Sequence, residues 1–101
     1  MHFGLTALGS AQPAWVVAST NGVTPVTPTA APSWTTYEEG TNTAVQTGTM
    51  TGEVDSKTGL YRVSITASSG NGYGKSKTYL IHMSYVSGGT TYVQTGTFTV
   101  V

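Results

Sequence analysis

Histidine is the side chain most often used for catalysis near neutral pH, and this chain has two. His82 lies in the run Leu80-Ile81-His82-Met83, on the strand face opposite Ile81 and Met83, and no carboxylate shares its strand. His2 lies at the start of the chain, far from His82 in sequence, and this is not the spacing of metal ligands. We therefore expect His82 to be a partly exposed structural residue, and we predict no histidine-based catalytic or metal site.

The carboxylates fall in two places along the chain. Glu38 and Glu39 point to opposite sides of an extended strand, whereas a glycosidase needs two carboxylates that face one sugar ring. Glu53 and Asp55 share a side, but Lys57 stands where a calcium loop would place an oxygen ligand. We interpret all four as solvated loop charges, with a calcium loop as the alternative for the second pair.

Two further patterns of catalytic proteins can be set aside. No serine lies in a G-x-S-x-G context. Residues 70–76, GNGYGKS, have the composition of a phosphate loop, but a strand follows them where such a loop needs a helix. We therefore predict an inter-strand loop, no catalytic residue and no cofactor, and an enzyme is the third and least favoured class of function.

Aromatic residues are the last candidates for a chemical role. A sugar-stacking platform is one use for them, and the candidates are Trp15, Trp34, Tyr37, Tyr73 and Tyr92. All except Tyr73 fall in runs with strand patterning, so we expect most of them in a core.

Residues 58–101 contain three runs of alternating apolar and polar residues, each bounded by glycine. Side chains of a strand point to opposite sides with period two, so these runs predict strands with one buried face. The predicted core consists of Trp34, Tyr61, Val63, Ile65, Tyr79, Ile81, Met83, Phe98 and Val100. Neither a helical periodicity nor an internal repeat is expected.

The first half of the chain contains shorter runs and more turn residues. Further strands are predicted near residues 15–19, 33–38 and 44–50, and the proline-rich residues 24–32 are interpreted as a connection between two sheets. We divide the chain into an N-terminal arm or first edge strand, residues 1–14, and a β-sandwich domain, residues 15–101. The arm either forms a strand of the sandwich or, the favoured alternative, adds to a sheet edge of a neighbouring subunit.

Composition limits the partners of this chain. Its 101 residues suffice for one domain, and they include no cysteine, so the redox compartment stays open. Four basic residues balance four acidic ones, which gives no long-range field for nucleic acid or an acidic membrane. The start of the chain lacks the basic and apolar segments of a signal peptide, so we expect synthesis and use in the cytoplasm.

Several short motifs occur in an order that resembles a known group of proteins. They are APSWTTY at 31–37, GTM at 48–50, TGLY at 58–61, GYGK at 72–75, KTY at 77–79, a Gly88-Gly89 hairpin and TFTV at 97–100. From about Trp15 onward the chain resembles the small immunoglobulin-like β-sandwich proteins encoded among the structural genes of tailed bacteriophages. Members serve as capsid decoration or as head–tail and tail accessory proteins. Fibronectin-like and adhesin modules share the pattern, and the cysteine pair of antibody domains is missing.

The resemblance implies an all-β, immunoglobulin-like antiparallel β-sandwich of about seven strands, with Tyr61 as its tyrosine-corner residue. It implies a non-enzymatic virion structural protein that binds a phage capsid or tail lattice, most simply as a decoration or cement protein. A carbohydrate-binding or adhesin-type module is the alternative. The expected partners are a major capsid protein or a tail or neck protein, together with self-association, and the expected location is the virion after synthesis in the host cytoplasm.

Six residues are the candidates for contacting a partner. Phe3, Leu5 and Leu8 are apolar residues of the N-terminal arm, which something must cover in water. Asn71, Tyr73 and Lys75 lie in the glycine-rich loop between two well-patterned strands. With so few charges available, we expect these contacts to rest on apolar packing and hydrogen bonds.

Overall fold

The chain folds into strands joined by turns, with two short 3₁₀ turns and no α-helix. The computed structural model describes all 101 residues. Its elements are β1 (His2–Thr6), β2 (Ala11–Val17), β3 (Ser33–Glu38), β4 (Ala44–Thr49), β5 (Thr51–Gly52), η1 (Val54–Ser56), β6 (Leu60–Thr66), η2 (Ser69–Asn71), β7 (Lys77–Ser87) and β8 (Thr90–Val100). No helix is long and apolar enough to cross a membrane. The predicted all-β class is confirmed.

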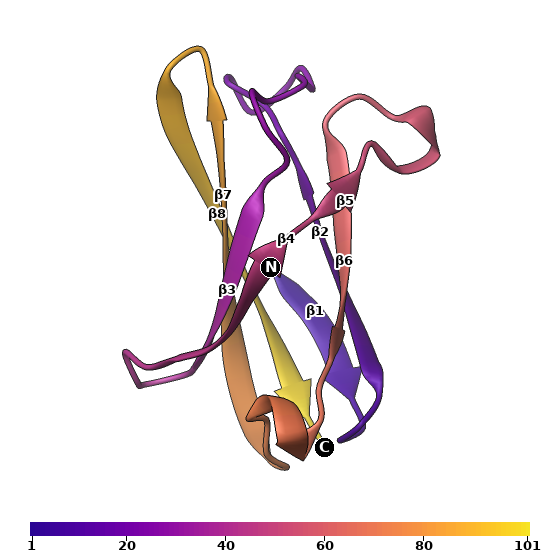
Figure 1. The fold of residues 1–101 in the computed structure, drawn as a ribbon, viewed down its shortest axis with the longest axis vertical. Helices are drawn as coiled ribbons and strands as arrows, with labels where there is room; N and C mark the ends of the chain where they lie inside the picture. Colours follow the sequence, from indigo (N-terminus) through magenta and orange to yellow (C-terminus); the bar gives the residue numbers. More distant parts are fainter.

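The strands form two sheets (Figure 1). The larger sheet has the order β1-β8-β7-β3-β4 and the smaller one β2-β6-β5. Neighbours pair antiparallel, except that β1 runs parallel to β8. Residues 24–32 lie between β2 and β3 and connect the two sheets, as predicted.

The structure has one strand more than the predicted number of about seven, because a short strand, β5, follows the predicted run of residues 44–50 and lies in the other sheet. The chain leaves the larger sheet after β4 and enters the smaller one at β5, and Met50 lies between them. Met50 is buried, so an apolar side chain anchors the crossing point in the core. The structure therefore has eight strands.

Alternation of side chains places the core between the two sheets. Eight of the nine predicted core residues are buried, and they are Trp34, Tyr61, Ile65, Tyr79, Ile81, Met83, Phe98 and Val100. The ninth, Val63, is half-buried and packs at the margin of the same cluster. A slip of one residue in β7 or β8 would have turned these side chains outward, so the predicted register of both strands is confirmed.

The N-terminal residues form an edge strand of the domain itself. β1 pairs with residues 97–100 of β8, and the backbone N–H of Val101 donates to the carbonyl of Thr6. The alternative in which a free arm adds to a neighbouring subunit is therefore not the arrangement in this structure. The ring of Phe3 packs over Gly96 and lies edge-on to Trp15, with 4.8 Å between the ring centroids.

The expected boundary between residues 14 and 15 falls inside β2. The strand begins at Ala11 and includes Pro13, which pairs with Ser64 of β6. Proline is tolerated there because β2 is an edge strand, so one side of its backbone needs no partner in the sheet. Gln12 is buried and donates from Nε2 to the carbonyl of Phe3. This side chain therefore joins β2, at the edge of the smaller sheet, to β1, at the edge of the larger one.

Candidate functional site

The outer face of the larger sheet is a regular grid of mostly small polar side chains. Four strands contribute three residues each, and strand pairing aligns them in rows: Val93, Ser84, Ser33 and Thr49; Thr95, His82, Thr35 and Thr47; Thr97, Leu80, Tyr37 and Ala44. Five threonines, two serines and one tyrosine make this surface rich in hydroxyl groups, and none of its residues is charged. We call these twelve residues the hydroxyl face.

Side chains of the hydroxyl face bond to one another and to the neighbouring strand. The contacts are Ser33 Oγ to Ser84 Oγ (3.1 Å), Thr35 Oγ1 to Thr47 Oγ1 (3.1 Å) and His2 Nδ1 to Thr97 Oγ1 (2.9 Å). Serine and threonine are short, and each hydroxyl both donates and accepts hydrogen bonds. Such a surface can bind a flat, uncharged protein surface by packing and hydrogen bonds.

His82 lies at the centre of the hydroxyl face, between Thr35 and Thr95. It is half-buried and points away from the core residues Ile81 and Met83, as predicted. No group of three or more His, Cys, Asp or Glu side chains in the chain is arranged to hold a metal ion.

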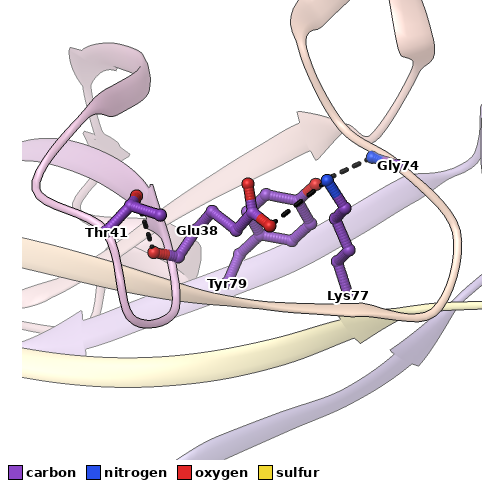
Figure 2. Close-up of polar contacts among 5 residues, drawn as sticks. All are labelled: Glu38, Thr41, Gly74, Lys77 and Tyr79. Atoms are coloured by element: carbon purple, nitrogen blue, oxygen red, sulfur yellow. Dashed lines mark hydrogen bonds and ion pairs between the residues drawn. The ribbon is translucent and has the colours of Figure 1, made fainter.

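A concavity of about 580 Å³ opens at one end of the hydroxyl face. Tyr37, Leu80, His82 and Thr97 line it from the face, and the turn of residues 38–42 forms its other wall. Two side-chain contacts help to hold this turn, and Figure 2 shows both: the Glu38 carboxylate pairs with Lys77, and the Thr41 hydroxyl donates to the carbonyl of Glu38. The pair is exposed, so it contributes at most about 1 kcal/mol to stability.

The structure separates the six predicted partner-binding residues. In β1 and the turn after it, Leu5 is 69% exposed, whereas Phe3 and Leu8 pack against the core. In the glycine-rich loop, Asn71 and Lys75 are exposed, and Asn71 donates from Nδ2 to the carbonyl of Thr66. These residues do not form one surface with the hydroxyl face, which contains none of the six.

Tyr73 is a correction to the predicted partner surface. It is only 3% exposed, because the loop turns back at η2 and places its ring between the sheets against Tyr79. Its hydroxyl bonds to Thr36 Oγ1 (2.8 Å) and donates to Gln46 Oε1 (2.9 Å). Burial raises the pKa of the Tyr73 hydroxyl above its ordinary value of 10.0, while the bond to Thr36 opposes the shift and the nearby Tyr79 adds to it. Tyr73 is thus a core residue.

Tyr61 does not make the hydrogen bond to backbone that a tyrosine-corner residue would make. No hydrogen bond holds the Tyr61 hydroxyl, and burial, with Glu53 as a second cause, raises its pKa. Near the start of β7, the Tyr79 hydroxyl instead accepts a bond of 2.7 Å from the backbone N–H of Gly74, five residues upstream (Figure 2). Further along β7, the Tyr85 hydroxyl bonds to both backbone groups of Ser19.

A short internal repeat is a signal for the hydroxyl face that the sequence prediction missed. Residues 45–51 read VQTGTMT and residues 93–99 read VQTGTFT. In both segments the two threonines before and after glycine lie on the hydroxyl face, as Thr47 and Thr49 in one and Thr95 and Thr97 in the other. The expectation of no internal repeat is therefore wrong at the scale of one strand.

The aromatic residues do not form an exposed, coplanar pair of rings on which a sugar chain could stack. Tyr85 and Tyr92 stack with 5.5 Å between centroids, but Tyr85 is buried. Trp34 is buried as well, whereas Trp15 is 38% exposed. In comparisons with protein-family models, curated proteins and solved structures, no match was found.

Proposed function

We propose that this chain is a non-catalytic, immunoglobulin-like structural module that docks on a protein lattice, a phage capsid or tail, through the hydroxyl face. The strand order supports the immunoglobulin-like assignment. In that fold one sheet contains strands C, F and G and the other contains B, E and D. With β2 to β8 taken as B, C, C′, D, E, F and G, both sheets have this order, and β1 joins the sheet of G.

Two side chains support the same assignment. A tyrosine near the start of strand F bonds to backbone a few residues upstream, and Tyr79 makes such a bond to Gly74. A buried tryptophan on strand C is a further hallmark, and Trp34 is buried on β3. Where antibody domains have a cysteine two residues after the tyrosine, this chain has Ile81, fully buried, so apolar packing takes the place of the disulfide.

The uncharged hydroxyl face is the observation that carries the proposed docking role. The eight charged residues of the chain all lie outside it. The core of a protein–protein interface is depleted of charge, so the face can be buried without removing an ion from water. The resemblance to phage structural modules supplies the class of partner, and it favours capsid decoration over an adhesin role.

Purified phage particles provide the test. Protein bound to particles is quantified by mass spectrometry and located by electron microscopy, with Thr95→Lys in the hydroxyl face and Ser64→Lys as the control. Both residues are exposed strand residues, but Ser64 belongs to the smaller sheet. Thr95→Lys should abolish particle binding and Ser64→Lys should leave it unchanged, because only the first places an ammonium group in the interface.

The dependence of binding on ionic strength provides a second test. Occupancy of the wild-type protein should change little between low and moderate ionic strength, because no charged residue lies in the interface. Full occupancy of the Thr95→Lys variant, or a steep loss of wild-type occupancy with salt, would show that another surface binds the lattice.

A further inference from the structure

The outer face of the smaller sheet carries a feature that the docking role does not use. Trp15 projects from β2 directly opposite Arg62 of β6 and is 38% exposed. The ring of Phe3 meets it edge-on at an angle of 70°, which fixes the indole from the β1 side. An exposed, laterally supported tryptophan is a rigid apolar platform with one open side.

A hollow of about 290 Å³ lies on that open side. Its lining residues are Trp15, Val54, Asp55, Leu60 and Arg62. Neither Asp55 nor Arg62 belongs to an ion pair, since the one ion pair of the chain joins Lys77 and Glu38. The hollow thus combines an indole, an unpaired carboxylate and an unpaired guanidinium.

The backbone that presents Asp55 is strained. Asp55 and Ser56 have φ values of 53° and 58°, in the left-handed region that side chains other than glycine seldom occupy. Such strain persists where the surroundings hold it, and it concentrates at binding sites. Here Glu53 holds the turn, because its carboxylate accepts hydrogen bonds from the Thr27 hydroxyl and from the backbone N–H of Gly59.

We propose that this hollow binds a single pyranose ring of a neutral saccharide. The apolar face of the sugar would stack on Trp15, Asp55 would accept hydrogen bonds from two hydroxyls, and Arg62 would donate to another oxygen. The two opposite charges favour a ligand without net charge. The volume lies just below the range of about 300–1,000 Å³ for drug-sized ligands, which suits one ring at the end of a glycan.

The site is independent of the proposed docking role. It lies on the outer face of the smaller sheet, whereas the hydroxyl face belongs to the larger one. A copy docked by the hydroxyl face would therefore leave Trp15 free to meet a glycan. A variant that no longer binds glycosides can still be tested for particle binding, and a variant that no longer binds particles can still be tested for glycoside binding.

Titration of the ¹⁵N-labelled protein with methyl glycosides of glucose, galactose, mannose and N-acetylglucosamine tests the proposal. At least one glycoside should shift the Trp15 indole N–H resonance saturably at millimolar concentration, while the resonance of the buried Trp34 stays in place. Trp15→Ala should abolish the binding. Tyr37→Ala, in the concavity of the hydroxyl face, is the matched control and should leave it unchanged.

Asp55 separates a binding role from a structural one. Asp55→Gly suits the left-handed φ, so it should keep or raise the melting temperature while weakening binding at least about tenfold, the loss expected for one hydrogen bond to a charged group. Asp55→Asn keeps one acceptor and should weaken binding less. If no glycoside shifts the Trp15 resonance, or if Asp55→Gly binds as the wild type does, the proposal is wrong.

Discussion

Residues 45–51 and 93–99 have nearly the same sequence but different surroundings. In both segments glutamine, glycine and a large apolar residue face the core, while the two threonines that flank glycine face outward. In β4 the ring of Trp34, from the neighbouring strand β3, covers Gly48. In β8 the ring of Phe3, from the edge strand β1, covers Gly96.

In both segments an aromatic ring covers the glycine, but one ring belongs to the core and the other to an edge strand. Each glycine leaves space for an aromatic ring that a Cβ atom would fill. Trp34 is 6% exposed and belongs to the core, so its position is fixed by the whole domain. Phe3 is half-buried on an edge strand, so its ring can leave without opening the core. We therefore expect a substitution at Gly48 in β4 to lower the stability of the whole domain, and one at Gly96 in β8 to loosen mainly the edge strand β1.

Gly48→Ala should have the largest effect on stability. The added Cβ would lie 2.9 Å from Cζ2 of Trp34, and overpacking of this kind costs about 1–3 kcal/mol. Chemical denaturation should show this loss of unfolding free energy.

Gly96→Ala is the matched substitution in the other segment. Its Cβ would collide with the Phe3 ring, which can swing into solvent. We expect a smaller loss of global stability, with fast hydrogen exchange confined to β1. If Gly96→Ala costs more than Gly48→Ala, β1 is an integral part of the folding unit and the distinction between the two segments fails.

The two inward glutamines provide the next comparison. Gln46 accepts the hydroxyl bond of buried Tyr73, whereas Gln94 donates to the carbonyl of Val17 at an exposed site. Gln46→Ala should cost about 1 kcal/mol, because a buried hydroxyl loses one of its partners. Gln94→Ala should stay within about 0.5 kcal/mol. Equal melting temperatures for the two variants would show that the Tyr73 hydroxyl is satisfied by Thr36 alone.

Alkaline pH tests the same buried hydroxyl. Because the pKa of Tyr73 is raised in the folded state, the unfolded chain releases this proton first, and stability should fall as pH rises above about 10. Below that pH the Tyr73 hydroxyl is protonated in both states, and its contribution to the free energy of unfolding is fully present. Tyr73→Phe removes this titration, so its stability should decline less steeply between pH 9 and 11 in thermal melts, although it starts lower because Thr36 and Gln46 lose a partner. An unchanged slope would show that other groups, such as Tyr61, control the alkaline transition.

Much of the fold was predictable because period-two patterning is a local signal. It identified the strands of the second half and the buried faces of β7 and β8. It left residues 1–14 open between a free arm and an edge strand, because a register irregularity between His2 and Gly4 breaks the alternation there, and because the parallel partner of β1 lies at the other end of the chain.

The candidate site was harder to predict than the core. Tyr73 is placed by a loop that turns back through a left-handed Gly72, and loops carry no periodicity from which burial can be read. The hydroxyl face depends on the order of four strands, β8-β7-β3-β4, which local patterns do not determine. The repeated VQTGT was visible in the sequence, but its meaning required knowing that both copies face the same side.

The smallest effect on stability is expected on the hydroxyl face itself. The Thr47 hydroxyl donates to the carbonyl of Trp34 and pairs with Thr35, whereas no side-chain hydrogen bond involves Thr95. Thr47→Val should therefore cost a few tenths of a kcal/mol and Thr95→Val nothing measurable, since both sites are exposed. Valine keeps the shape and the strand preference of threonine, so any loss of particle binding by Thr95→Val reflects the missing hydroxyl. A variant that melts like the wild type and binds particles more weakly would assign this hydroxyl to docking. If Thr95→Val binds normally, shape and absence of charge, rather than hydrogen bonding, govern the contact.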